Sequence, residues 1–93
     1  VTPDEIADIH NLRLTATVDG QLMQAGNTGA MIFDIPKIIA YISEDITLRP
    51  GDIISTGTPS GVGIFRDPPI PLKSHHVVTC EIEGIGTLKN EFI

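Results

Sequence analysis

Residues 51–63 read Gly51-Asp52-Ile53-Ile54-Ser55-Thr56-Gly57-Thr58-Pro59-Ser60-Gly61-Val62-Gly63. The preceding proline and Gly51 are turn residues, because proline presets φ and glycine tolerates positive φ. The β-branched pair Ile53-Ile54 is typical of a short buried strand. Three glycines within the last seven residues then allow backbone N–H groups to approach a ligand closely. The sequence therefore predicts a turn, a short strand and a glycine-rich loop whose polar side chains are neutral hydroxyls.

Three well-known loop motifs do not fit this segment. A phosphate-binding P-loop needs Lys followed by Ser or Thr after its last glycine, where Ile64-Phe65 stands. The glycine spacing also differs from the dinucleotide fingerprint, and Ser60 lacks the flanking glycines of a serine-hydrolase elbow. On pattern alone, a structural loop between strands is favoured over a substrate-binding loop.

Length and composition restrict the function classes. Ninety-three residues make one domain at most, with a thin core. The net charge of −6, without any basic cluster, argues against nucleic acid or an anionic membrane surface as a partner. The single cysteine, Cys80, excludes an internal disulfide and fits a reducing compartment, so we expect the cytoplasm. Because the chain begins at Val1 and not at Met, we expect it to be a piece of a longer protein.

Residues 11–26 carry the clearest local pattern, that of a β-hairpin. Asp19-Gly20 is a strong two-residue turn signal between alternating segments. A hairpin without irregularities pairs Val18 with Gln21, Ala16 with Met23, and Leu14 with Ala25. Gln24 falls on the more polar face, where a solvated strand residue is favoured over a ligand contact.

A short helix is expected after Asp34. Asp34 or Ile35 can cap it, and isoleucines then recur at helical spacing as one apolar stripe that should pack on the sheet. A shorter helical turn is expected at Thr2–Ile6, where Thr2 can cap.

The C-terminal third predicts an irregular connector followed by two strands. Three prolines in residues 68–71 exclude a regular element there. Val77–Glu83 alternates, with Cys80 on the apolar face as a packed thiol, and Thr87–Ile93 can return as the last strand. The adjacent pair His75-His76 should point in opposite directions and is therefore a poor metal pair.

Residues 51–63 resemble the signature loop of the fumarylacetoacetate hydrolase family. Further matches stand in the family's order on both sides of it, and they cover nearly the whole chain: Val18-Asp19-Gly20, Gln24, Asn27-Thr28, Met31-Ile32-Phe33, Ile38-Ile39-Ala40-Tyr41, Leu72-Lys73 and Glu81 to Asn90. The chain departs from the family's pattern at Gly29-Ala30. The resemblance is nearest to the 2-hydroxyhepta-2,4-diene-1,7-dioate isomerase and acylpyruvase-like branch.

The resemblance implies a fold of mainly β (α+β) class. Residues 1–93 would form the C-terminal portion of a catalytic domain, part of a mixed β-sheet barrel or roll with one short amphipathic helix. It also implies a divalent metal, usually Mg²⁺ with Mn²⁺ or Ca²⁺ as alternatives, that holds a 2-oxo or enol acid. The implied chemistry is C–C bond hydrolysis, decarboxylation or keto–enol isomerisation.

The same resemblance assigns few site residues to this chain. Thr58 matches the threonine that contacts a substrate oxygen, and Gly57 helps to shape that pocket. The family's Glu-x-Glu pair and later Asp, which hold the metal, have no counterpart in residues 1–93. Glu81-x-Glu83 shares only their spacing, because it aligns with the family's C-terminal strand. No catalytic residue and no metal ligand carries over.

Two interpretations of different classes remain open. In the first, the chain supplies the substrate-binding loop of an enzyme that a missing N-terminal half or another chain completes, and a homo-oligomer such as a dimer is expected. In the second, it is a non-catalytic remnant or association module. A small-ligand binding module is a weaker third interpretation, because nothing charged in the loop would hold an anionic substrate.

Overall fold

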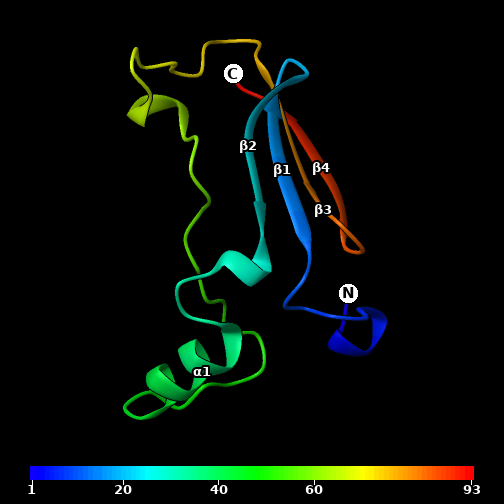
Figure 1. The fold of residues 1–93 in the computed structure, drawn as a ribbon, viewed down its shortest axis with the longest axis vertical. Coiled ribbons are helices and arrows are strands. Elements are labelled where there is room, and N and C mark those ends of the chain that lie inside the picture. The colour runs from blue at the N-terminus through cyan, green and yellow to red at the C-terminus, as the bar shows by residue number, and fades with distance from the viewer.

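The computed structural model describes all residues 1–93 and shows an open antiparallel sheet with a long irregular arm (Figure 1). The sheet order is β2-β1-β3-β4, and every neighbouring pair is antiparallel. The strands are β1 (Arg13–Val18), β2 (Gln21–Asn27), β3 (Val77–Ile82) and β4 (Gly86–Glu91), and the single α-helix is α1 (Ile35–Ser43). Short 3₁₀ turns cover Pro3–Glu5, Thr28–Ala30 and Gly63–Phe65. The expected mainly β class with one short helix is confirmed, and the sheet does not close within the chain.

The β1–β2 hairpin turns where the sequence predicts, but its register changes. Val18 faces Gln21 as expected, and Asp19 and Gly20 both have positive φ, at 50° and 80°. The expected pairs Ala16–Met23 and Leu14–Ala25 are wrong, because the register shifts between Ala16 and Thr17. Ala16 then faces Gln24, so β2 carries one extra residue, Met23, in a β-bulge.

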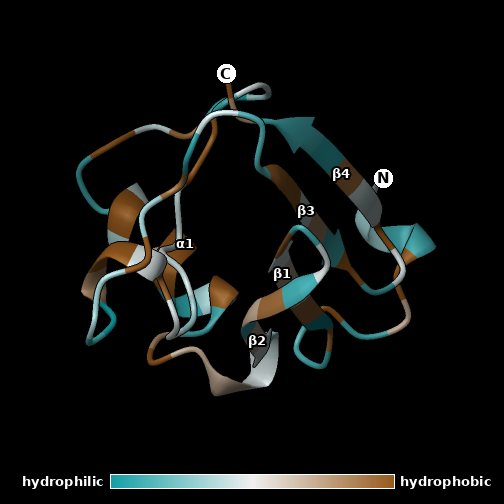
Figure 2. Cartoon of the chain, turned by 90° about the horizontal axis from the view of Figure 1, so that it is seen from above, coloured by the Kyte–Doolittle hydropathy of each residue, from teal (hydrophilic) through white to brown (hydrophobic).

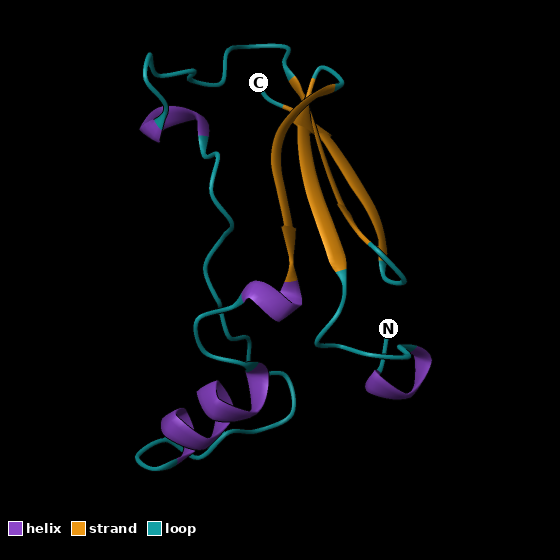
Figure 3. Ribbon diagram, in the orientation of Figure 1, coloured by secondary structure: helices purple, strands orange, loops and turns teal.

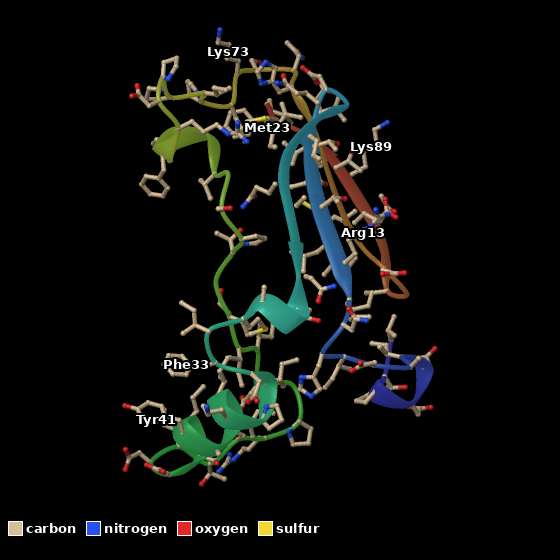
Figure 4. The ribbon with its side chains drawn as sticks, viewed as in Figure 1. Arg13, Met23, Phe33, Tyr41, Lys73 and Lys89 are labelled. Atoms are coloured by element: carbon tan, nitrogen blue, oxygen red, sulfur yellow. The ribbon has the colours of Figure 1, made fainter.

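The bulge matters for packing. Met23 is the only buried residue of the chain, with 9% of its surface exposed. Its side chain points toward the 3₁₀ turn at Gly63–Phe65 (Figure 4), and its Cε lies 3.8 Å from a Cβ built on Gly63. The extra residue of the bulge therefore contacts the irregular arm.

Helix α1 lies beyond one end of the sheet (Figure 1) and, seen from above, to one side of the strands (Figure 2), so its expected packing on the sheet is wrong. The Asp34 side chain accepts a hydrogen bond from Lys37 N at 2.9 Å, which confirms the expected N-cap. The apolar stripe is only partly covered, since Ile39 is 43% exposed. Phe33 and Tyr41 project away from the sheet (Figure 4). No helix has the length and apolar character that a membrane crossing requires.

Two further expectations about buried elements are wrong. Ile53-Ile54 forms no strand, and Ile53 is 94% exposed. A strand needs a hydrogen-bonding neighbour, and residues 53–61 make no backbone–backbone hydrogen bond at all. Cys80 is exposed instead of packed, because nothing in the 93 residues covers β3 at that point. Figure 3 shows that the irregular arm between α1 and β3 is mostly loop.

Candidate functional site

The loop of residues 53–61 is fastened to the sheet by the side chain of Gln24. Gln24 Nε2 donates to Thr58 Oγ1 at 2.8 Å and to the backbone oxygen of Pro59 at 2.6 Å. Gln24 lies in β2, one position beyond the bulge residue Met23. The expectation of a solvated strand residue is therefore wrong, since the side chain links two segments 34 residues apart.

A second side chain fastens the end of the same loop. Arg66 Nε donates to the backbone oxygen of Gly61 at 3.0 Å, and its Nη2 donates to the backbone oxygen of Met23. A guanidinium has five N–H donors in a rigid plane, so it can satisfy both carbonyl groups at once. Arg66 thus joins the loop to the bulged part of β2.

Two glycines permit this close approach of loop and strand. A Cβ built on Gly26 would lie 2.9 Å from Pro59 Cβ, and one built on Gly61 would lie 2.2 Å from the backbone oxygen of Met23. Gly61 also has a φ of +103°, which other residues rarely adopt. Gly61 of the signature segment and Gly26 of β2 therefore allow the loop to pack on β2.

The loop forms one wall of an open groove of about 720 Å³. Gly57 and Thr58, the two expected site residues, both line this groove and are both exposed. The opposite walls come from β1, β2, the end of β3, the Thr28–Ala30 turn and residues 31–38, which include the start of α1. The lining is apolar apart from hydroxyl and amide groups: Leu14, Ala25, Gly26, Asn27, Thr28, Ala30, Met31, Ile32, Phe33, Ile38, Thr56, Gly57, Thr58, Pro59, Ser60 and Ile82.

No charged side chain lines the groove. Hydroxyl groups and backbone N–H groups can donate hydrogen bonds to a carbonyl or carboxylate oxygen. They cannot neutralise a whole negative charge in a partly desolvated site. The groove can therefore orient an oxygen ligand, while the balancing positive charge has to come from outside these residues.

The carboxylates and imidazoles of the chain do not fit a divalent metal centre. No three His, Cys, Asp or Glu side chains come together in an arrangement that could hold a metal ion. Glu83 accepts a hydrogen bond from Arg13 N at 3.3 Å. His75 contacts Glu91 at 2.7 Å, while His76 lies 3.9 Å from Asp19, so the adjacent imidazoles turn to different partners.

The sequence contained little signal for the two fastening residues. Gln24 sits in an alternating strand like any polar surface residue, and its partners are 34 and 35 residues away. Arg66 precedes the proline-rich connector as Lys73 follows it, and the contact of Arg66 with Met23 spans 43 residues. Gln24 and Arg66 meet their partners only in the folded chain, so the local sequence does not predict these contacts.

Comparison with known proteins identifies relatives of this architecture. The family profile described as Fumarylacetoacetate (FAA) hydrolase C-terminal matches residues 1–93. The mitochondrial oxaloacetate tautomerase FAHD2B of Bos taurus is 50% identical over 93 residues, which cover 100% of this chain and 30% of that protein. The chain thus spans about a third of the length of the curated relatives it matches.

Solved structures of related proteins superpose closely on the chain. Maleylpyruvate hydrolase from Sphingobium sp. SYK-6, in complex with manganese (II) ion and pyruvate, superposes with a TM-score of 0.88 at 35% identity, covering 98% of this chain and 32% of that one. The 2-hydroxyhepta-2,4-diene-1,7-dioate isomerase from Mycobacterium marinum gives 0.79 at 42% identity, covering 91% and 31%. With the profile matching the whole chain, the protein belongs to the fumarylacetoacetate hydrolase family and corresponds to its C-terminal part.

Proposed function

We propose that residues 1–93 supply the substrate-binding loop of an enzyme that acts on small 2-oxo or enol acids. The observation that carries this proposal is the exposed pair Gly57 and Thr58 on the wall of an uncharged groove. Relatives named for oxaloacetate and maleylpyruvate support the substrate class. The reaction would be C–C bond hydrolysis, decarboxylation or keto–enol isomerisation, with the Thr58 hydroxyl holding a substrate oxygen.

The distribution of charged residues suggests which part of the enzyme would bind the metal and which would bind the substrate. The chain has no residue set that fits a divalent metal and no charged group in the groove. In this proposal the metal site, with Mg²⁺, Mn²⁺ or Ca²⁺, belongs to other segments, and residues 1–93 are the C-terminal portion of the catalytic domain. Those segments lie in the same polypeptide or in another chain, and a homo-oligomer such as a dimer is part of the proposal. The competing proposal is a non-catalytic remnant that keeps only the groove.

A chimera tests the two proposals against each other. Residues 1–93 replace the aligned segment of the bovine relative, and turnover of oxaloacetate and of an acylpyruvate is measured with Mg²⁺ and with EDTA. We expect turnover by the chimera that EDTA abolishes, and none by the 93-residue chain alone. Turnover by the chain alone would contradict the proposed division of labour. An inactive but folded chimera would favour the remnant.

Substitution at Thr58 locates the binding group. In the active chimera, Thr58→Val should lower kcat/KM about tenfold to a hundredfold, the effect of one hydrogen bond to a charged group. Thr47→Val is the matched control, since Thr47 is exposed and outside the groove. Equal effects of the two substitutions would remove Thr58 from the proposed site.

The compartment is a separate proposal. The single cysteine Cys80 supports a reducing compartment, for which we propose the cytoplasm. The bovine relative is named as mitochondrial. Fractionation of cells that express the natural protein distinguishes the two compartments, and recovery in mitochondria would refute the cytoplasmic proposal.

A further inference from the structure

We infer that Gln24 is a positioning residue that fixes the Thr58 hydroxyl as a hydrogen-bond donor toward the ligand. The inference rests on the proposed role of Thr58 in binding a substrate oxygen and adds the residue that sets the direction of its O–H bond. It assigns to Gln24 a role that its place in β2 alone does not suggest.

The orientation of the Gln24 amide follows from its partners. The backbone oxygen of Pro59 can only accept a hydrogen bond, so the group 2.6 Å from it must be the NH₂ of Gln24 and not the carbonyl oxygen. The same nitrogen lies 2.8 Å from Thr58 Oγ1. Its two hydrogens can serve the two oxygens separately, which leaves the Thr58 oxygen as an acceptor in this contact.

The consequence for Thr58 is directional. A hydroxyl has one hydrogen and two lone pairs, and one lone pair now faces Gln24. The hydrogen must therefore point elsewhere, and the exposed Thr58 side chain borders the groove. An oxygen that accepts, such as a carbonyl or carboxylate, matches this hydrogen, whereas an ammonium group could only donate to the remaining lone pair and would leave the hydrogen unused.

No other interaction of the loop can replace this one locally. Residues 53–61 make no backbone–backbone hydrogen bond, and the Arg66 contact lies at the far end, on Gly61. Gln24 is itself held by the paired β1–β2 ladder. Gln24 in the paired strand β2 thus orients the Thr58 hydroxyl, which lies in a loop without backbone–backbone hydrogen bonds.

The test uses the full natural polypeptide that carries residues 1–93, and pyruvate with Mg²⁺ as the probe in titration calorimetry. Gln24→Met removes the donor at similar size. Gln21→Met is the matched control, because Gln21 lies on the same strand, is exposed and makes no side-chain hydrogen bond. We expect about a tenfold weaker affinity for Gln24→Met, the effect of one lost hydrogen bond to the ligand, and less than a twofold change for Gln21→Met.

A double-mutant cycle with Thr58→Val separates positioning from packing. If Gln24 acts through the Thr58 hydroxyl, Gln24→Met should weaken pyruvate binding no further once residue 58 has lost that hydroxyl. Additive losses would overturn the inference, as would equal losses for Gln24→Met and Gln21→Met. Pyruvate binding that Thr58→Val leaves unchanged would refute the proposed function of Thr58 instead. A parent protein that does not bind pyruvate would refute the proposed function and the inference that rests on it.

Discussion

A substitution at Gly61 would show whether the ligand site requires the close contact between the loop and β2. An added methyl group would meet the backbone oxygen of Met23 at 2.2 Å, and the φ of +103° is unfavourable for alanine. Gly61→Ala should therefore push the loop off the strand and weaken pyruvate binding more than tenfold, as measured by calorimetry on the full natural polypeptide.

Gly84 provides the matched control for backbone strain. Its φ is +74°, but a built Cβ has nothing within 4 Å, so Gly84→Ala adds strain of about 1–2 kcal/mol without a clash. We expect pyruvate affinity to stay within twofold in that variant. Similar losses in both variants would show that strain, and not the approach of Gly61 to Met23, controls the site.

Thr2 controls the ionisation of two neighbouring carboxylates. A hydrogen bond from the Thr2 hydroxyl is the main cause that lowers the pKa of Asp4, whereas the Thr2 backbone N–H is the main cause for Glu5. Thr2→Ala should therefore raise the pKa of Asp4 toward its usual value and leave that of Glu5 mostly lowered. An NMR titration of the side-chain carboxyl carbons measures both, and equal shifts would contradict this assignment.

The sign of the resulting pH effect is fixed by the direction of these shifts. Both pKa values are lower in the folded turn than in the unfolded chain. The contribution to the stability of the Pro3–Glu5 turn is therefore present above the unfolded pKa values. It is lost as pH falls through the folded ones.

At the scale of elements, Asp19 joins the β1–β2 turn to β3. Its side chain accepts a hydrogen bond from Val77 N at 2.8 Å, and its own N–H donates to Val77 O at 2.8 Å. Asp19→Ala removes the first bond and places alanine at a φ of 50°. Asp19→Asn keeps an acceptor oxygen and a residue that tolerates this conformation.

Hydrogen exchange at the Val77 amide measures the difference between these variants. Asp19→Ala should speed exchange about fivefold to thirtyfold, corresponding to about 1–2 kcal/mol. Asp19→Asn should stay close to the parent. An unchanged rate in Asp19→Ala would mean that the β1–β3 ladder protects this amide without the hydrogen bond to the Asp19 side chain.

The hairpin also shows where local sequence information ends. Asp19-Gly20 predicts the turn and the pair Val18–Gln21, because both depend on adjacent residues. The shift between Ala16 and Thr17 places Met23 against the Gly63–Phe65 turn, 40 residues further on. A bulge that serves so distant a contact leaves no sign in the alternation of β2 itself.

For the molecule as a whole, the same limit explains the wrong strand and the missed Gln24. Ile53-Ile54 has the side chains of a buried strand, yet no strand of this chain pairs with it. Thr58, which lines the groove, is held by the side chain of Gln24, 34 residues away. The sequence predicts residue chemistry and local turns well, whereas which segments meet depends on long-range contacts.

The exposed surface of the molecule is too large for a chain of this size. The accessible area is 7453 Å², whereas a folded monomer of 10.0 kDa has about 5,200 Å². The radius of gyration is 15.4 Å, against about 12 Å for a compact chain of this length. Large apolar side chains such as Ile53, Ile32 and Phe65, at 94%, 90% and 86% exposure, account for part of the excess.

This excess predicts how residues 1–93 behave without further segments. An excess of roughly 2,000 Å² on one partner is the scale of an obligate interface, which holds a fold together through apolar burial. The separate chain should therefore bind a hydrophobic dye such as ANS, associate in sedimentation velocity experiments and lack a cooperative thermal transition. The chimera with the bovine segments should lose dye binding and melt cooperatively, because in the proposed enzyme those segments would cover the same surface. A monomeric chain that melts cooperatively and binds no dye would show that the open sheet and its arm are stable without a partner, and the proposed dependence on further segments would then fail.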